Sequence, residues 1–371
     1  LDSKADERRV PRPRRVAFVV TKKRGLDIFD YGDRTVVDAR VGAWTSALAA
    51  GGDASAAGRE AANVVFGPLR TFLGGARVLS IAPSGGLRGA PLDLLVFALG
   101  DEAFRPDVRV RATAREFTFV DPTRLRSPSL VVVASPSFDD DADAPTLYAK
   151  TSVGFADASL RPTEAPPRYG TSTDAISRDV LKEIRSAERS ADACAAIEDL
   201  FRGVYPQAPF ERAAGKDARR PRLETAAAST AYLHVDAPIF VAPDDTDVAP
   251  HAPRSGAMHA YKACGLALAG VASKRAASTG DRGFTAAQIA DLNLFGCDLV
   301  VLSSGPPIRS PERAALAVAT LQDALHRAGA KSAITALWRV PEEASRAFFA
   351  EFYRLLWIEK SPKAAAMREA K

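Results

Sequence analysis

The sequence predicts an α/β fold with a mainly parallel sheet and flanking helices, preceded by a smaller α+β N-terminal part. Two observations support this class. Short apolar runs alternate with helical patterns over the C-terminal two thirds of the chain, and charged or proline-rich segments separate them. Runs that are apolar on both faces and lie between helices are typical of central parallel strands joined by right-handed crossovers. Four such runs are residues 129–134, 231–236, 298–302 and 332–337.

The N-terminal part has the pattern of a hairpin, a helical pair and a further strand. The expected elements are strands at 15–20, just after the turn at 23–25 and at 77–82, with helices at 38–50 and 54–73. Two adjacent glycines at 74 and 75 end the second helix. We therefore expect this part to extend over residues 15–127, after a basic arm at 1–14.

The C-terminal part, residues 128–371, is expected to be one α/β domain. Its helical patterns lie near 174–189, 257–269, 285–294 and 342–357. Two proline-rich stretches without a sustained period, 138–170 and 243–254, predict long loops. Residues 209–222 are charged and irregular, and we expect no strand there.

Composition limits the function classes. Of 371 residues, 47% are hydrophobic and 26% charged, which is ordinary for a globular protein. No run is long enough to span a membrane and no signal peptide opens the chain, so we expect a cytoplasmic protein without membrane partners. Cys194, Cys264 and Cys297 have no metal-like or paired spacing. We expect no metal and no cofactor.

The positive charge is concentrated at the start of the chain. Six basic residues with prolines between them lie in the first fifteen: Lys4, Arg8, Arg9, Arg12, Arg14 and Arg15. No groove-entering or base-stacking motif follows, so the composition favours a linker over nucleic-acid binding. The chain begins without methionine and ends within a helical pattern, and we expect it to be part of a longer protein.

Candidate chemistry lies where two of the predicted strands end. His234 and Asp236 close one strand and share its face, because successive side chains alternate. Ser303, Ser304 and Gly305 follow the other strand. Functional sites in parallel sheets gather at the carboxyl ends of strands. A lone histidine there is more often structural than catalytic, and a serine nucleophile needs a base within hydrogen-bond reach.

Six segments together resemble a known family. They are 78–95, 231–240, 264–269, 283–294, 298–305 and 330–340. In order and character they are similar to the CHAT family, which are caspase- and separase-like cysteine peptidase domains often joined to tetratricopeptide repeats. The resemblance covers roughly residues 15–371. It implies a caspase-like sheet and, for active members, cysteine endopeptidase activity.

This chain departs from the family at the catalytic dyad. The family has a strand ending His-x-x-x-His-Gly, whose second histidine is the base, and a strand ending Leu-Ser-Ala-Cys, whose cysteine is the nucleophile. By this resemblance the first histidine is His234, the second falls on Pro238, and the cysteine falls on Gly305. Neither residue can form a thiolate and base pair.

The departure predicts a pseudopeptidase that acts as a protein-binding, scaffolding or regulatory module. Two alternatives remain open: a cysteine endopeptidase with displaced catalytic residues, and a serine hydrolase using Ser304. The motifs around the dyad are otherwise intact, so we expect a Pro238→His and Gly305→Cys double variant to regain a reactive thiol.

The resemblance also implies a place for a partner. Trp338, Glu342 and Glu343 occupy the loop where the family has Leu-Trp-x-Val followed by acidic residues near its substrate cleft. We expect a protein or peptide partner at this strand-end cleft. We also expect an upstream helical-repeat domain, as in relatives.

Overall fold

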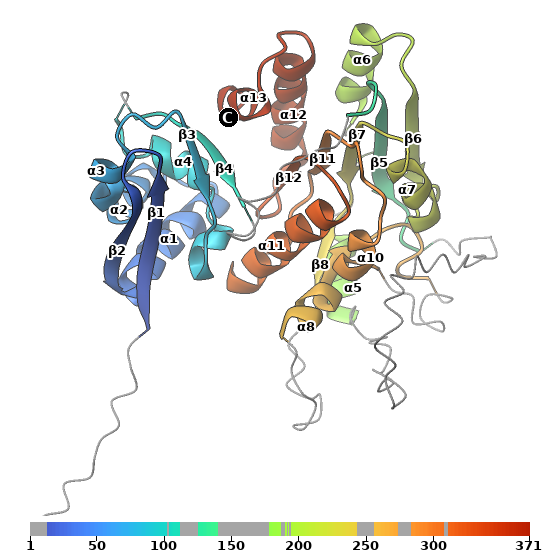
Figure 1. Ribbon diagram of the computed structural model, residues 1–371. Helices are drawn as coiled ribbons and strands as arrows, with labels where there is room; N and C mark the ends of the chain where they lie inside the picture. The colour runs from blue at the N-terminus through green and yellow to red at the C-terminus, as the bar shows by residue number, and fades with distance from the viewer. Residues whose placement is uncertain are drawn as a thin grey trace, which may run out of the picture. The chain divides into compact units, whose positions relative to one another are not determined.

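The computed structural model describes residues 13–101, 104–111, 125–139, 178–186, 190, 192, 194–242, 256–273, 283–307 and 311–371 (Figure 1). The chain forms two compact units, Leu1–Thr118 and Phe119–Lys371. The expected arm at 1–14 and most of the two expected loops lie outside the described residues. Within the described part, no helix combines the length and the apolar character needed to cross a bilayer.

The first unit is an α+β assembly. A two-stranded antiparallel hairpin and a two-stranded parallel pair accompany the helices, which surround one apolar core. The elements are β1 (Arg14–Thr21), β2 (Gly25–Asp33), α1 (Arg34–Ala49), α2 (Ser55–Val65), α3 (Arg70–Leu73), β3 (Val78–Ile81), α4 (Leu92–Phe97) and β4 (Asp107–Val110). The Asp33 carboxylate accepts from the Thr35 backbone N–H and caps α1. The predicted hairpin, helical region and third strand are confirmed, and β4 is additional.

The second unit is built on a five-stranded parallel sheet in the order β12-β11-β7-β5-β6. Its strands are β5 (Leu130–Pro136), β6 (Phe210–Gly215), β7 (Tyr232–Asp236), β11 (Leu299–Leu302) and β12 (Ala333–Thr335). The four predicted strands and the α/β class are confirmed. β7 lies between β5 and β11 at the centre, so both of its neighbours run in the same direction.

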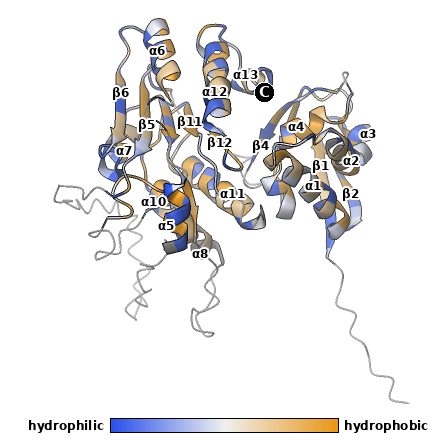
Figure 2. Ribbon diagram, turned by 180° about the vertical axis from the view of Figure 1, so that it is seen from behind, coloured by the Kyte–Doolittle hydropathy of each residue, from blue (hydrophilic) through white to orange (hydrophobic). Residues whose placement is uncertain are grey.

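Helices cover both faces of this sheet. One face packs against α6 (Ala195–Val204), α12 (Glu342–Trp357) and α13 (Lys363–Glu369). The other packs against α7 (Arg220–Ala227), α10 (Ala286–Ala290) and α11 (Pro311–Arg327). Figure 2 shows the apolar residues of the central strands between these helices. The alternation along β7 sends Leu233 and Val235 into the α11 face, so His234 and Asp236 point toward the α12 face.

A smaller antiparallel sheet lies beyond the carboxyl end of β7. It contains β8 (Ile239–Val241), β9 (Cys264–Leu266) and β10 (Phe284–Thr285), in the order β10-β9-β8. Two helices accompany it, α5 (Arg178–Arg185) and α8 (Gly256–Ala263). The first strand of this sheet, β8, begins directly after Pro238. The sheet therefore shapes the candidate site.

Two local predictions are wrong. The segment 257–269 is not one helix, because α8 ends at Ala263 and β9 follows directly. The segment 209–222 contains the edge strand β6 rather than an irregular loop. β6 mixes apolar and charged residues because only one of its long edges is paired, and its Arg212 forms an ion pair with Glu198 on α6. A charged strand of this kind gives no continuous apolar run to detect.

Candidate functional site

The two positions expected to have carried a catalytic dyad follow neighbouring strands. Leu302 of β11 lies opposite Val235 of β7, and the Ser303 backbone N–H extends the pairing by donating to the Val235 carbonyl at 3.1 Å. Pro238 and Gly305 each come three residues after this pair. Because the two strands run in the same direction, Pro238 and Gly305 both lie just beyond the carboxyl edge of the sheet.

At Gly305 the fold leaves no space for a side chain. A Cβ atom built there would lie 2.1 Å from the carbonyl oxygen of Trp338 and 2.3 Å from its carbonyl carbon. These neighbours are backbone atoms in the segment after β12, so a rotamer change does not relieve the overlap. The Gly305→Cys and Pro238→His variant therefore needs the Trp338 backbone to move before it can present a reactive thiol, and its recovery stays a prediction. The backbone around Gly305 has closed over the nucleophile position.

Pro238 is enclosed by other parts of the unit. Its carbonyl accepts from the Ala267 backbone N–H at 2.8 Å, which fixes the start of the small sheet. A depression of about 180 Å³ beside it has no interior volume that a water molecule could occupy. The depression is lined by Val180, Glu183 and Ile184 of α5 and by Pro238, Ile239, Phe240, Pro307 and Arg339. The position of the expected base thus faces a helix of the same chain.

The two serines before Gly305 have different surroundings. Ser303 Oγ donates to Asp236 Oδ1 at 2.7 Å, so it joins the carboxyl ends of β11 and β7. Ser304 is completely buried, and its Oγ has no hydrogen-bond partner among the described residues. Within the part of the chain that the structure describes, neither arrangement brings an imidazole to a serine hydroxyl.

His234 lies in the apolar layer under α12. Its side chain is 1% exposed, its ring meets the Phe349 ring edge-on at 5.0 Å, and its Nδ1 lies 3.2 Å from Tyr353 Oη. Burial raises the pKa of Tyr353 well above its ordinary value, so the phenol stays protonated, and the imidazole tautomer decides which group donates. The imidazole therefore serves as a hydrogen-bonded core residue in this arrangement. Two further histidines, His251 and His259, lie in or beside the predicted loop 243–254, and their side chains are outside the described residues.

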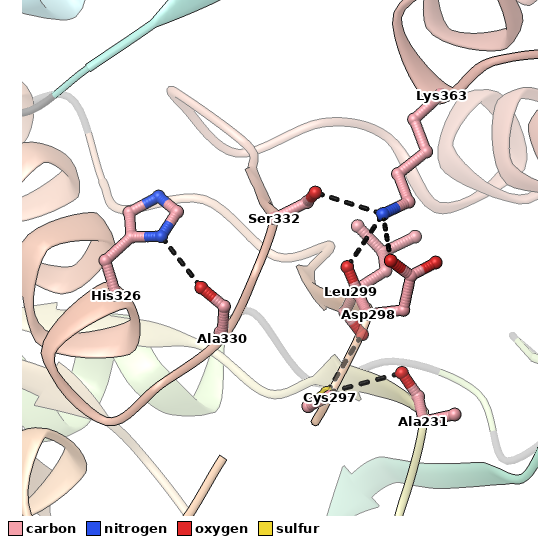
Figure 3. A network of polar contacts seen from close by, with 8 residues as sticks. All are labelled: Ala231, Cys297, Asp298, Leu299, His326, Ala330, Ser332 and Lys363. Carbon is pink, nitrogen blue, oxygen red and sulfur yellow. Dashed lines mark hydrogen bonds and ion pairs between the residues drawn. The ribbon is translucent and has the colours of Figure 1, made fainter. Parts of the chain in front are cut away.

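The three cysteines are buried, and none of them is in a disulfide in the described part of the chain. Burial raises the pKa of Cys264 to about 12 and that of Cys297 to about 11. Cys297 precedes β11, at the opposite edge from Gly305, and its Sγ lies 3.4 Å from the Ala231 carbonyl oxygen (Figure 3). Both thiols therefore stay protonated at neutral pH, whereas the nucleophile in cysteine catalysis is the thiolate.

The residues expected to contact a partner divide between structural and exposed positions. Trp338 is half-buried and supplies the backbone that covers Gly305. Glu342, at the first turn of α12, accepts from the Ser190 hydroxyl and from its backbone N–H, the latter at 2.9 Å. These hydrogen bonds, with a smaller contribution from Arg346, lower the pKa of Glu342. Glu343 is exposed.

A residue that the sequence did not single out connects these features. Arg339 follows Trp338, and its guanidinium donates to the Glu183 carbonyl at 3.0 Å and to Ser186 Oγ at 3.1 Å. It thereby joins the loop after β12 to α5. In the sequence, Arg339 occupies the unspecified position of the Leu-Trp-x-Val motif. The motif therefore gave no indication that this residue has a role.

A second polar network occupies the opposite edge of the sheet (Figure 3). Lys363 Nζ donates to Asp298 Oδ1 at 2.5 Å, to the Asp298 carbonyl at 2.9 Å and to Ser332 Oγ at 3.1 Å. These contacts attach α13 to the starts of β11 and β12. Among the residues that the structure describes, no cluster of histidine, cysteine, aspartate and glutamate could hold a metal ion.

The parallel sheet order, the helices on both faces and the paired strand ends define a caspase-like α/β protein. A comparison with protein-family models matches residues 55–371 to the CHAT domain, and the chain belongs to this family. A search of curated proteins gave no significant match.

Proposed function

We propose that this protein is a catalytically inactive CHAT domain that acts as a protein-binding or regulatory module. The observation that carries the proposal is the contact at Gly305, where a Cβ atom would lie 2.1 Å from the Trp338 carbonyl oxygen. The nucleophile of a caspase-like peptidase needs a side chain at this place and room for a substrate carbonyl beside it. Here backbone fills that room.

The remaining nucleophiles support the same conclusion. The Cys264 and Cys297 thiols are buried and have raised pKa values. The Ser304 hydroxyl is buried without a hydrogen-bond partner among the described residues, so no base activates it there. These observations argue against both the displaced cysteine peptidase and the serine hydrolase. Three free thiols also fit a reducing compartment such as the cytoplasm.

A binding function uses what the fold retains. The sheet still presents its carboxyl edge, with the exposed Glu343 and the half-buried Trp338 next to it. We infer that a protein partner contacts this edge. Catalysis is not required for such a module, because a folded scaffold with a shaped surface is sufficient.

The test is a hydrolysis assay on the purified chain. We expect no cleavage of a casein-type substrate or of peptides ending in arginine, lysine, leucine or aspartate. An active cysteine peptidase serves as the positive control. Turnover that survives repurification, and that is lost in Ser304→Ala or Cys297→Ala, would overturn the proposal.

A labelling assay covers peptidase activity on substrates outside that panel. A thiol-directed covalent peptidase inhibitor should leave the native chain unmodified and should label it after unfolding in denaturant. Stoichiometric labelling of one cysteine in the native state would identify an active thiol and contradict the proposal.

A further inference from the structure

The surface over Pro238 is covered by an eight-residue helix of the chain itself. α5 places Val180 and Ile184, four residues apart, against the wall formed by Phe240, Ala242 and Ala267. Both α5 side chains are buried, at 6% and 2% exposure. Residues four apart lie on the same helix face, so α5 binds the wall as an amphipathic helix.

Polar contacts fix the direction of this helix. Arg339 donates to the Glu183 carbonyl at 3.0 Å and to Ser186 Oγ at 3.1 Å, both at the C-terminal end of α5. Arg339 adds a donor to the Glu183 carbonyl, which also accepts from Ser186 Oγ, and its positive charge complements the negative end of the helix dipole. Arg185 forms an ion pair with Asp139. The wall therefore recognises an apolar helix stripe and a helix C-terminus.

The surface on which α5 packs is separate from the main core. Val180 and Ile184 belong to a small cluster with Phe138, Phe240, Ala242, Ala267 and Val271, whereas the central sheet has its own clusters on both faces. The depression beside Pro238 is lined both by α5 and by this wall, so it marks the boundary between them. An isolated helix of this length is not stable in water and depends on its packing. The two clusters on the central sheet contain no residue of α5.

We propose that this surface is a helix-binding groove that α5 occupies within the chain, and that the partner supplies a competing amphipathic helix. The matching partner helix carries branched apolar residues four apart and ends beside Arg339. This inference rests on the proposed function and specifies its binding site. It differs from a peptidase cleft, which holds an extended substrate strand.

The experiment uses a fluorescein-labelled synthetic peptide of residues 178–190 and the full chain. Binding is measured by fluorescence anisotropy to the wild type, to a Val180→Asp and Ile184→Asp double variant, and to Lys182→Asp. Lys182 is exposed on the same helix and is the matched control. We expect the double variant to bind at least about tenfold more tightly than the wild type, because an occupied groove reduces the apparent affinity by its free fraction. Lys182→Asp should bind like the wild type.

The outcomes separate this inference from the proposed function. A peptide carrying the same two aspartates should not bind any of the proteins. Equal binding to wild type and double variant, or no binding to a double variant with a native circular dichroism spectrum, overturns the groove. Mass spectrometry of the recovered peptide tests the proposed function separately, since cleavage would contradict inactivity without affecting the binding result.

A second measurement applies if the double variant does not fold. In Arg339→Ala, hydrogen exchange should become faster in the α5 amides and stay unchanged in β5, β7 and β11. If the wild-type α5 amides exchange as slowly as those strands, α5 opens only on global unfolding. That result overturns the inference, because a fixed core helix leaves no groove for a partner.

Discussion

The two edges of the five-stranded sheet use polar groups differently. At the amino edge, Lys363, Asp298 and Ser332 form one hydrogen-bonded network that attaches α13 (Figure 3). At the carboxyl edge, Gly305 contacts the Trp338 backbone. The edge at which parallel sheets place their chemistry has become a packing surface, and the other edge carries the charge pair.

This difference bears on the proposed inactivity, because it concerns where the fold places ionisable groups and open space. Catalysis requires ionisable groups next to open space, and such groups reduce stability unless they are paired. At the carboxyl edge, Pro238 and Gly305 carry no ionisable group, and the Trp338 backbone occupies the space beside Gly305. The retained polar atoms there, such as Ser303 and Asp236, bond to each other across the two strands.

The largest expected effect is that of a side chain at Gly305. Gly305→Ala places a Cβ atom against the Trp338 carbonyl, and the displaced backbone should lower the free energy of unfolding by about 3–5 kcal/mol. Denaturant unfolding followed by circular dichroism measures the loss. Gly305→Cys should be destabilised at least as much, with no thiol that iodoacetamide labels below the ordinary pKa.

Gly203 provides the control for this prediction. It lies in α6, and a Cβ atom built there meets nothing within 4 Å. Gly203→Ala should raise the free energy of unfolding by about 0.5–1 kcal/mol, since alanine favours the helix. If Gly305→Ala is as stable as the wild type, the carboxyl edge is open, and the central argument for inactivity is lost.

How well a strand could be predicted from the sequence depended on how that strand is buried. β5, β7 and β11 are buried on both faces and appear in the sequence as apolar runs. β9 was not recognised because its three residues continue the small apolar pattern of α8. Its identity depends on a contact distant in sequence: Gly265 lies so close to β10 that an added Cβ atom would be 2.2 Å from the Phe284 carbonyl oxygen.

For the site, the sequence indicated where the dyad positions fall but not how closely the backbone packs around them. Pro238 and Gly305 were evident from the strand ends that resemble the family. The overlap with Trp338 depends on the path of the chain after β12, which no local pattern specifies. The cover formed by α5 was equally hidden, because an i, i+4 apolar pair does not indicate which surface it packs against.

The amino edge should respond moderately to mutation. Lys363→Met leaves the mostly buried Asp298 carboxylate without its ammonium partner and should cost about 2 kcal/mol. Replacing both residues, as Lys363→Met with Asp298→Leu, should recover most of that loss because no charge remains buried. Thermal and denaturant unfolding of the single and double variants check this. A double variant less stable than Lys363→Met would mean that the pair stabilises more than its burial costs.

The pH dependence of Lys363 sharpens the comparison. Burial lowers the pKa of Lys363 despite the attraction of Asp298. The unfolded chain therefore binds more protons than the folded chain between that lowered pKa and about 10.4, the ordinary lysine value. In this window the contribution of Lys363 to stability should rise with pH, and Lys363→Met should remove that rise.

A smaller effect is expected at Tyr353 of α12, beside His234. Tyr353→Phe removes the hydrogen bond to His234 and should cost about 1 kcal/mol at neutral pH. Burial raises the pKa of Tyr353, so above about pH 10 the unfolded chain releases a proton that the folded chain keeps. Stability should fall with rising pH there, and the fall should be shallower in Tyr353→Phe. An identical alkaline slope in both proteins would show that the phenol is accessible in the folded state.

The smallest expected effect is that of Ser304, and its neighbour provides the contrast. Ser304→Ala removes a buried hydroxyl that has no hydrogen-bond partner among the described residues, so stability should be unchanged or rise by up to about 1 kcal/mol. Ser303→Ala instead leaves the buried Asp236 oxygen without its donor at 2.7 Å and should cost about 1–3 kcal/mol. Denaturant unfolding of both variants under one set of conditions makes the comparison. If Ser304→Ala is the more damaging of the two, the Ser304 hydroxyl has a partner in solution, and the case against a serine nucleophile must be reopened.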